Sequence, residues 1–267
     1  HDLSFLRLRR YYNPLERIIK RLKLMYTLRI ADRIVASSEN LKRDLVRYLK
    51  IDPDKIDVIY RSCNHIFTLP PTATKVAEVR EKYALPKRYI LNVGAHNEAK
   101  NQSLIIEALP LLPESLHLVL VGKPTPYTKH LLHRAKSLGI SSRVHHYHNL
   151  TTDELAAIYS EACALVHPSL YEGFASQIIE AQSIGIPVIA SKGSSMEETG
   201  GKHSLYVSPK SHKELAEAIS NILYPEDNHY EGKSLRLKQQ YFFVSATVQS
   251  IVRKHRAQYG TLRNFHE

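Results

Sequence analysis

The stretch YILNVGAHNEAKNQSLIIEALPLLPESLHLVLVG, residues 89–122, predicts a strand, a helix and a second strand in direct succession. Its two ends, YILNVG and LHLVLVG, are apolar nearly throughout, which is typical of strands buried on both faces. The segment between them, NQSLIIEALPLL, has its apolar residues at helical spacing. Because a strand–helix–strand unit joins parallel strands, this stretch favours a parallel sheet covered by helices.

The same alternation of short apolar runs and helical segments continues on both sides. Toward the amino end, RIVASS (33–38) and KIDVIY (55–60) predict strands, and ENLKRDLVRYL (39–49) predicts a helix capped by Ser38. Toward the carboxyl end, the predicted helices include YTKHLLHRAKSLG, TDELAAIYSEA and HKELAEAISNIL, and the predicted strands are RVHHYH, ALVHPS, IPVIAS and LYVS. The predicted fold class is therefore α/β, with helices on both faces of a parallel sheet.

Two further segments bear on the domain organisation. Residues 61–75, RSCNHIFTLPPTATK, contain Pro70 and Pro71 and lack periodicity, so they predict a linker between domains. The segment FVSATVQSIVRKHRAQY (243–259) predicts a last helix near the carboxyl end.

The positive charge is concentrated near the amino end. The whole chain has a net charge of +11, and residues 1–50 hold 13 Lys or Arg against 5 Asp or Glu, a net charge of +8. There, NPLERIIKRLKLMYTLRIADRIV interleaves apolar and basic residues, which predicts an amphipathic basic helix suited to an anionic membrane surface. A solvated helix face is the alternative interpretation. No zinc-finger spacing, aromatic RNA-binding signature or basic helix followed by heptads occurs, so we expect no nucleic-acid partner.

The cysteines and the chain start indicate the cellular setting. Cys63 and Cys163 share no close spacing, which favours reduced thiols in a cytoplasmic protein over a disulfide framework or a zinc site. No apolar run reaches the roughly 18–20 residues that a membrane-spanning helix needs. The chain starts with HDLSFL, without an initiator methionine or a signal-peptide pattern, and we expect it to be part of a longer protein.

Three strand ends carry groups suited to an anionic ligand, since ligands of open parallel sheets bind at the carboxyl ends of the strands. These groups are Gly94 and Lys100 in VGAHNEAKN, Lys123 in VGKP, and Gly173 with the amides of Ala175 and Ser176 in EGFAS. Free amides at a helix N-terminus favour phosphate. No GxGxxG follows a strand and no GxxxxGK[ST] occurs, so dinucleotide cofactors and P-loop nucleotide hydrolysis are not favoured.

Two glutamates, Glu172 and Glu180, flank the third junction in SLYEGFASQIIEAQSIGIPVIAS (169–191). Glu172 lies in a loop at a strand end, and Glu180 lies about one turn into a helix, where a carboxylate can accept hydrogen bonds from ribose hydroxyls. Together with the helix amides, the pair indicates a nucleotide-sugar site. The alternative interpretation is that Glu172 is an exposed loop residue and Glu180 a charge favoured by the helix dipole.

The segment RVHHYH contains three histidines that invite a metal interpretation. Alternation along a strand places His146 and His148 on one face and His145 on the other. No nearby Cys or Asp completes a ligand set, so we expect no metal site.

The segment PSLYEGFASQIIEAQSIGIPVIAS resembles the Glu-x7-Glu segment of retaining glycosyltransferases of family 4, which have the GT-B fold. Further matching segments follow in the family's order over essentially the whole chain: ADRIVASSENLKRDLVRYLKIDPDKIDVIY, ILNVGAHNEAKNQSLIIEAL, LVLVGKP and RVHHYHNLTTDELAAIYSEACALVHPSLYEGF. The resemblance implies two facing Rossmann-like domains. Residues 1–70 would be the tail of the N-terminal, acceptor-side domain, residues 71–245 the nucleotide-sugar-binding domain, and residues 246–267 a helix crossing back.

The resemblance also implies roles for individual residues. Glu172 would contact the donor sugar, Glu180 the nucleotide ribose and Lys100 the donor phosphate, and His1 would face the donor sugar. His148 and Asn149 would lie near the nucleotide base. The expected donor-site residues are Gly94, Ala95, His96, Lys123, His148, Asn149, Gly173, Phe174, Ala175, Ser176 and Glu180, with Glu172, Lys100 and His1 as catalytic residues.

By analogy with the family, the implied reaction is glycosyl transfer from a nucleoside-diphosphate sugar to a glycan or lipid-linked acceptor. Anomeric configuration would be retained, and no metal or other cofactor would be required. We expect a cytoplasmic protein, peripheral at the inner membrane face through residues 5–33, that needs its N-terminal half for turnover. A non-catalytic nucleotide-sugar-binding or scaffold module and a basic membrane- or nucleic-acid-binding protein are the alternatives.

Four positions depart from the family's pattern. Ala95 stands where an arginine is expected, which removes one phosphate cation, and His96 is the neighbouring candidate to replace it. Ala175 replaces the second glycine after EGF, and Arg61 and Ser62 replace the Asn-Gly pair after the strand 55–60. The first departure and the expected absence of the N-terminal half favour the non-catalytic alternative.

Overall fold

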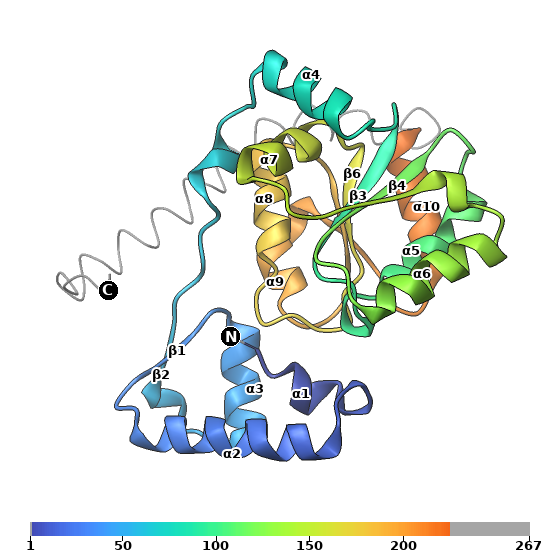
Figure 1. The fold of residues 1–267 in the computed structure, drawn as a ribbon. Helices are drawn as coiled ribbons and strands as arrows, with labels where there is room; N and C mark the ends of the chain where they lie inside the picture. Colours follow the sequence, from blue (N-terminus) through green and yellow to red (C-terminus); the bar gives the residue numbers. More distant parts are fainter. Residues whose placement is uncertain (1, 225–267) are drawn as a thin grey trace.

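The structure, a computed structural model, describes residues 2–224. Figure 1 shows two lobes, a smaller one formed by the amino-terminal elements and a larger one in which a sheet lies between two layers of helices. His1 and residues 225–267 lie outside the described residues, and with them the predicted helix 243–259 and the expected segment 246–267.

The larger lobe contains a parallel six-stranded sheet in the order β5-β4-β3-β6-β7-β8. Its strands are β3 (Tyr89–Val93), β4 (His117–Val121), β5 (Val144–Tyr147), β6 (Ala164–His167), β7 (Val188–Ser191) and β8 (Leu205–Val207). The predicted apolar runs therefore form the sheet, and their continuous apolar character follows from burial on both faces. The α/β fold class is confirmed.

Two layers of helices cover this sheet. The covering helices are α4 (Ala73–Lys82), α5 (Gln102–Ala108), α6 (Pro126–Ser137), α7 (Thr152–Glu161), α8 (Ser176–Ile184), α9 (Met196–Gly200) and α10 (His212–Leu223). Side chains of α5, α6 and α10 pack with Ile90, Leu118 and Val166 on one face. Those of α4, α7, α8 and α9 pack with Leu91 and Leu165 on the other, so each strand contributes alternate residues to two cores.

The smaller lobe consists of helices around a two-stranded parallel sheet. Its elements are α1 (Ser4–Arg7), α2 (Pro14–Ile30), β1 (Ile34–Ala36), α3 (Glu39–Leu49) and β2 (Ile56–Val58), and β1 pairs with β2. Ser38 caps α3 as predicted, because its Oγ accepts a hydrogen bond of 3.0 Å from the amide of Leu41. Asn13 likewise caps α2, the predicted basic helix.

Short 3-10 helices connect several of these elements. They are η1 (Arg9–Tyr11), η2 (Pro53–Lys55), η3 (His65–Thr68), η4 (Glu98–Lys100), η5 (Leu109–Leu111), η6 (Ser141–Arg143) and η7 (Gly201–His203).

The segment 61–75 is more ordered than a linker. It contains η3 and the start of α4, and Phe67 is buried in the core of the larger lobe, where its ring meets Tyr159 edge to face. The short apolar cluster Ile66–Phe67 has no helical or strand period, so its burial was not predicted from the sequence. Within the described range 2–224, residues 59–64 pass between the two lobes without a helix or strand.

Candidate functional site

The strand order places a topological switch point between β3 and β6. From β3 the chain continues through β4 to β5 on one side of the sheet, and from β6 through β7 to β8 on the other. The loops that follow two such strands diverge, and the space outside their carboxyl ends is where open α/β sheets bind ligands. Here these loops are residues 94–101 and 168–175, which contain the predicted residues Lys100 and Glu172.

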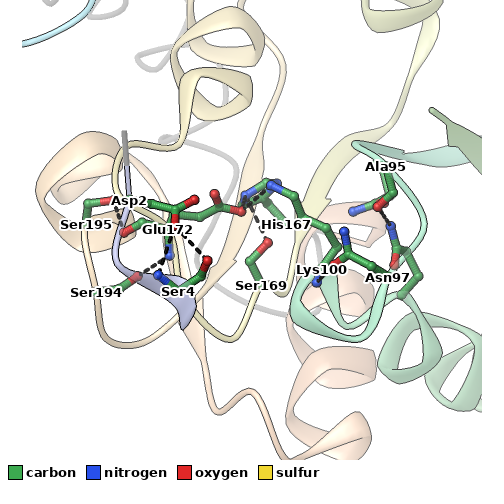
Figure 2. A network of polar contacts seen from close by, with 12 residues as sticks. Asp2, Ser4, Ala95, Asn97, Lys100, His167, Ser169, Glu172, Ser194 and Ser195 are labelled. Carbon is green, nitrogen blue, oxygen red and sulfur yellow. Dashed lines mark hydrogen bonds and ion pairs between the residues drawn. The ribbon is translucent and has the colours of Figure 1, made fainter. Parts of the chain in front are cut away.

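Glu172 and Lys100 meet across this switch point (Figure 2). Lys100 Nζ lies 2.5 Å from Glu172 Oε1, and the same oxygen lies 3.1 Å from Nε2 of His167. His167 is the last residue of β6 and is fully buried, whereas the side chain of Glu172 remains 12% exposed. Glu172 is therefore fixed by Lys100 and His167 at the edge of the sheet and is not an exposed loop residue.

The environment keeps Glu172 ionised. Burial by itself raises the pKa of this carboxyl, but the hydrogen bond from His167 and the charge of Lys100 outweigh it and lower the pKa to about 2. At neutral pH the site consequently presents a buried negative charge beside the Lys100 ammonium.

The main chain of Glu172 is held by the loop that follows β7. Its amide donates to Ser194 Oγ at 3.2 Å, and its carbonyl accepts from Ser195 Oγ at 2.9 Å. On the Lys100 side, the side-chain nitrogen Nδ2 of Asn101 donates to the carbonyls of Pro168 and Pro209 at 3.0 and 2.9 Å. Loops from four strands are thus joined by hydrogen bonds around the Lys100–Glu172 pair.

Glu180 occupies the second predicted position. It lies in α8, whose amino end has no side-chain cap, and its Oε2 accepts a hydrogen bond of 2.9 Å from the hydroxyl of Tyr159. Burial raises the pKa of Glu180, although the Tyr159 hydrogen bond and the charge of Arg61 oppose the shift. Arg61, one of the positions that departs from the family pattern, therefore acts electrostatically on the helix carboxylate.

The other predicted residues fall into exposed and buried groups. Those that are exposed or half-exposed are Gly94, Ala95, Lys123, His148, Asn149, Phe174 and Ser176, and those that are buried are His96, Gly173 and Ala175. Gly94 lies against Lys100, because a Cβ at this glycine would come within 3.4 Å of the lysine side chain. The ring of Phe174 faces Tyr60 with centroids 6.5 Å apart.

His96 does not supply the cation that Ala95 lacks. Its side chain is fully buried, Nδ1 is hydrogen-bonded to Thr128 Oγ1 at 2.9 Å, and Nε2 is buried without a partner. Burial and the neighbouring His146 and His148 lower its pKa, so the ring is neutral at pH 7.

The histidines of the fifth predicted strand divide between the two faces, as alternation requires. His146 stacks on His148 with ring centroids 6.2 Å apart, whereas the ring of His145 hydrogen-bonds to His117 at 2.9 Å. Within residues 2–224, no group of three or more His, Cys, Asp or Glu side chains is arranged to hold a metal ion.

Sequence reasoning missed several residues that build the site. They are Ser38, Asn101, Tyr159, His167, Ser169, Ser194 and Ser195. His167 had a detectable signal, since a histidine ends an otherwise apolar strand five residues before Glu172. Ser38 was predicted only as a helix cap, and Ser169 lies two residues from its partner His167. Ser194 and Ser195 had no local signal, because their partner Glu172 is distant in sequence.

Two family models match the chain. The family model for glycosyl transferases group 1 matches residues 75–236, more than half of the chain, and the model for glycosyltransferase family 4 matches residues 1–65. The chain belongs to the group 1 glycosyl transferases. The two matches divide the chain close to the boundary between its two lobes.

One curated relative and two solved structures are similar to this chain. The O-antigen chain mannosyltransferase RfbU of Salmonella typhimurium is 29% identical over 225 residues, which cover 83% of this chain and 59% of RfbU. The fold is shared with Anabaena HepE, solved with UDP and glucose (TM-score 0.76, 19% identity, 89% of this chain and 66% of HepE). It is also shared with WaaG, a glycosyltransferase involved in lipopolysaccharide biosynthesis (TM-score 0.70, 17% identity, 98% of this chain and 70% of WaaG).

The likeness to HepE and WaaG confirms the GT-B fold class. The chain spans less than two thirds of the length of RfbU.

Proposed function

We propose that the complete protein transfers a hexose from a nucleoside-diphosphate sugar to a glycan or lipid-linked acceptor, with retention of anomeric configuration. The observation that carries this proposal is the meeting of Glu172 and Lys100 across the switch point, beside the uncapped amino end of the helix that bears Glu180. A cation and free amides suit a diphosphate, and Glu180 suits the ribose hydroxyls.

The roles of the residues follow from the charges. As the bond between the anomeric carbon and the phosphate oxygen breaks, Lys100 and the first amides of α8 stabilise the departing diphosphate. Glu172, ionised through its low pKa, stabilises the positive charge that develops on the sugar. The acceptor oxygen then bonds to the same face of the anomeric carbon and gives its proton to the leaving phosphate oxygen. We propose that this reaction needs no metal ion.

The identity of the donor can be approached through the relatives. RfbU is named a mannosyltransferase, and a further HepE structure contains UDP-glucose. Mannose and glucose are therefore the sugars to test first, each on the nucleotide that binds.

The decisive experiment is calorimetric titration of the chain with UDP, GDP and ADP. We expect one of the three to bind, and we expect Glu180→Ala to weaken that binding about tenfold or more, because a ribose hydrogen-bond acceptor is lost. Glu217→Ala, which changes an exposed glutamate on α10, is the matched control and should bind normally. Failure of the folded chain to bind any of the nucleotides would reject the proposal.

A non-catalytic nucleotide-sugar-binding module is the second candidate, and the missing cation at Ala95 and His96 favours it. Binding of a nucleoside diphosphate without sugar transfer by the complete protein would support this candidate. Transfer of a labelled sugar to an acceptor would exclude it.

We also propose that α2 contacts the anionic inner face of a membrane, which places the protein peripherally in the cytoplasm. The observation that supports this contact is an exposed apolar stripe on α2, formed by Leu15, Ile18, Ile19, Leu22, Tyr26 and Ile30. Exposed basic residues of the same helix, Arg21, Lys23 and Arg29, complement anionic head groups. Among the described helices none is long and apolar enough to cross a bilayer.

A further inference from the structure

His167 is a buried polar residue that the proposed reaction has not used. It ends β6, whose other residues are all buried and apolar, and its own side chain is fully buried. Nε2 lies 3.1 Å from Glu172 Oε1 and 3.2 Å from Ser169 Oγ, whereas Nδ1 is buried without a partner (Figure 2). A buried polar side chain is costly unless it is hydrogen-bonded, so the contacts of Nε2 indicate a specific role for His167.

The contact with Glu172 determines which ring nitrogen of His167 carries a proton. Only a ring that carries its proton on Nε2 can donate to the carboxylate of Glu172. His167 therefore carries a proton on Nε2 and is a fixed hydrogen-bond donor aimed at Glu172.

Both donors to Glu172 use one oxygen. Lys100 Nζ and His167 Nε2 contact Oε1, and Oε2 receives no hydrogen bond from any residue in the described range 2–224. The carboxylate is thereby oriented so that Oε2 is the oxygen left to meet a ligand. The two donors differ in mobility, since the Lys100 side chain is flexible and 22% exposed whereas the ring of His167 is enclosed.

We propose that His167 is a positioning residue that holds Oε1 of Glu172, so that this carboxylate stays ionised and presents Oε2 when Lys100 turns to the diphosphate of the donor. The part concerning Lys100 rests on the proposed function. Without His167, the departure of Lys100 would leave a buried carboxylate with no donor, and burial alone raises its pKa.

The test compares His167→Gln with His167→Leu. The amide nitrogen of glutamine reaches roughly the position of Nε2 and keeps a donor, whereas leucine removes it. The measurement is the pH titration of the Glu172 carboxyl carbon by NMR, in the free chain and with a saturating concentration of whichever of UDP, GDP or ADP binds. The matched control is His117→Gln, at the amino end of β4 and away from the loops that hold Glu172.

We expect the Glu172 midpoint in His167→Leu to rise by about one pH unit in the free chain and further with nucleotide bound. His167→Gln should restore most of the shift, and His117→Gln should cause none. A midpoint that is the same in the leucine variant and the unaltered chain, with and without nucleotide, would overturn the proposal.

A second measurement needs neither a variant nor a nucleotide. The nitrogen NMR shifts of His167 in the unaltered chain at pH 7 should show a proton on Nε2. A ring with its only proton on Nδ1 would overturn the proposal even if the leucine variant failed to fold. Absence of nucleotide binding would instead reject the proposed function and the step involving Lys100, while the free-chain midpoint still decides whether His167 acts on Glu172.

Discussion

Glu172 and Glu180 lie eight residues apart, yet their surroundings shift their pKa values in opposite directions. Both carboxyls are partly buried, which by itself raises the pKa of each. Glu172 has a cation and a ring donor, and these outweigh the effect of burial, whereas the hydroxyl of Tyr159 and the more distant Arg61 do not outweigh it at Glu180. Two carboxyls whose pKa values are shifted apart in this way can serve two roles, one as a permanent charge and the other as a hydrogen-bonding group.

The low pKa of Glu172 predicts a pH-dependent contribution to stability. Because its folded pKa of about 2 lies below the ordinary value of 4.5, ionised Glu172 contributes fully above pH 4.5 and loses this contribution as the pH falls toward 2. Glu172→Gln should therefore lower the free energy of unfolding at pH 7 by about 2–3 kcal/mol. Denaturant unfolding at a series of pH values measures the difference, which should shrink below pH 4.5.

The comparison for this prediction is Glu217→Gln, which removes an exposed carboxylate on α10. Its unfolding free energy should follow that of the unaltered chain at every pH. If the deficit of Glu172→Gln stayed constant down to pH 2.5, the ionisation of Glu172 would not be the cause.

Reasoning from individual residues predicted Glu172, Glu180 and Lys100 as site residues. It did not predict the contact between Lys100 and Glu172. The spacing of EGFAS and the strand ends indicated where each residue lies along the chain. That Lys100 and Glu172 meet depends on β3 and β6 being neighbours, which is a property of strand order. For His96, residue-level reasoning suggested a cation that the structure does not provide. The ring is buried and hydrogen-bonded to Thr128 of α6, a contact that the local sequence does not reveal.

At the scale of elements, the amino end of α3 is completed by a residue of the other lobe. The carboxylate oxygens of Glu198, in α9, accept hydrogen bonds from the amides of Glu39 and Asn40 at 2.6 and 2.9 Å. Ser38 Oγ, besides capping α3, donates to the carbonyl of Gly173 at 2.7 Å. The helix dipole and the free amides of α3 thus bind the carboxylate of Glu198. This residue lies in α9, close in sequence to Ser194 and Ser195, which contact Glu172.

We predict that Glu198→Gln destabilises the chain by about 1–2 kcal/mol, because two helix amides lose a charged acceptor. The same change should weaken the association of the lobes, so α3 should exchange its amide hydrogens faster than β4 does. Denaturant unfolding and hydrogen exchange followed by mass spectrometry measure the two effects.

Glu217→Gln again supplies the matched control, since it makes the same chemical change on an exposed helix face. Equal exchange rates for α3 in Glu198→Gln and in the control would show that the carboxylate does not secure the helix.

The elements themselves were largely predictable, and the exceptions have physical reasons. Strands with continuous apolar runs, such as β3 and β4, and helices with a strong period, such as α10, lie where the sequence indicated. Helix α4 was not predicted, because only Val79 along its length is buried and its apolar pattern is correspondingly weak. The 3-10 helix η3 and the short α9 are fixed by tertiary packing of Phe67 and Met196, which no local pattern reveals.

At the scale of the whole molecule, Tyr171 connects the donor-side loop to the smaller lobe. Its ring lies in the core cluster of that lobe, its hydroxyl donates to Asp44 Oδ2 at 2.8 Å, and the guanidinium of Arg7 lies over the ring. Since Glu172 follows directly, one peptide unit separates the carboxylate from a ring that is packed in the smaller lobe. The position of the lobes is therefore part of the site.

The smaller lobe also presents the apolar stripe of α2, and this surface carries the last prediction. At 3.6 residues per turn, its six side chains lie on one face, and each is between 45% and 69% exposed. The chain should sediment with vesicles of phosphatidylglycerol but not of phosphatidylcholine, and binding should fall as salt screens the basic residues. Ile18→Ser with Leu22→Ser should weaken binding about tenfold or more, because two anchoring side chains are lost.

The matched change is Leu111→Ser with Leu132→Ser, which replaces two exposed leucines of the larger lobe and should leave vesicle binding unchanged. Equal binding to both lipids, or equal binding by the two double variants, would contradict a membrane contact through α2. A second copy of the chain is the competing occupant of the stripe. Light scattering separates the two possibilities, because a dimer that Ile18→Ser with Leu22→Ser dissociates, without any affinity for anionic vesicles, would assign the stripe to self-association instead.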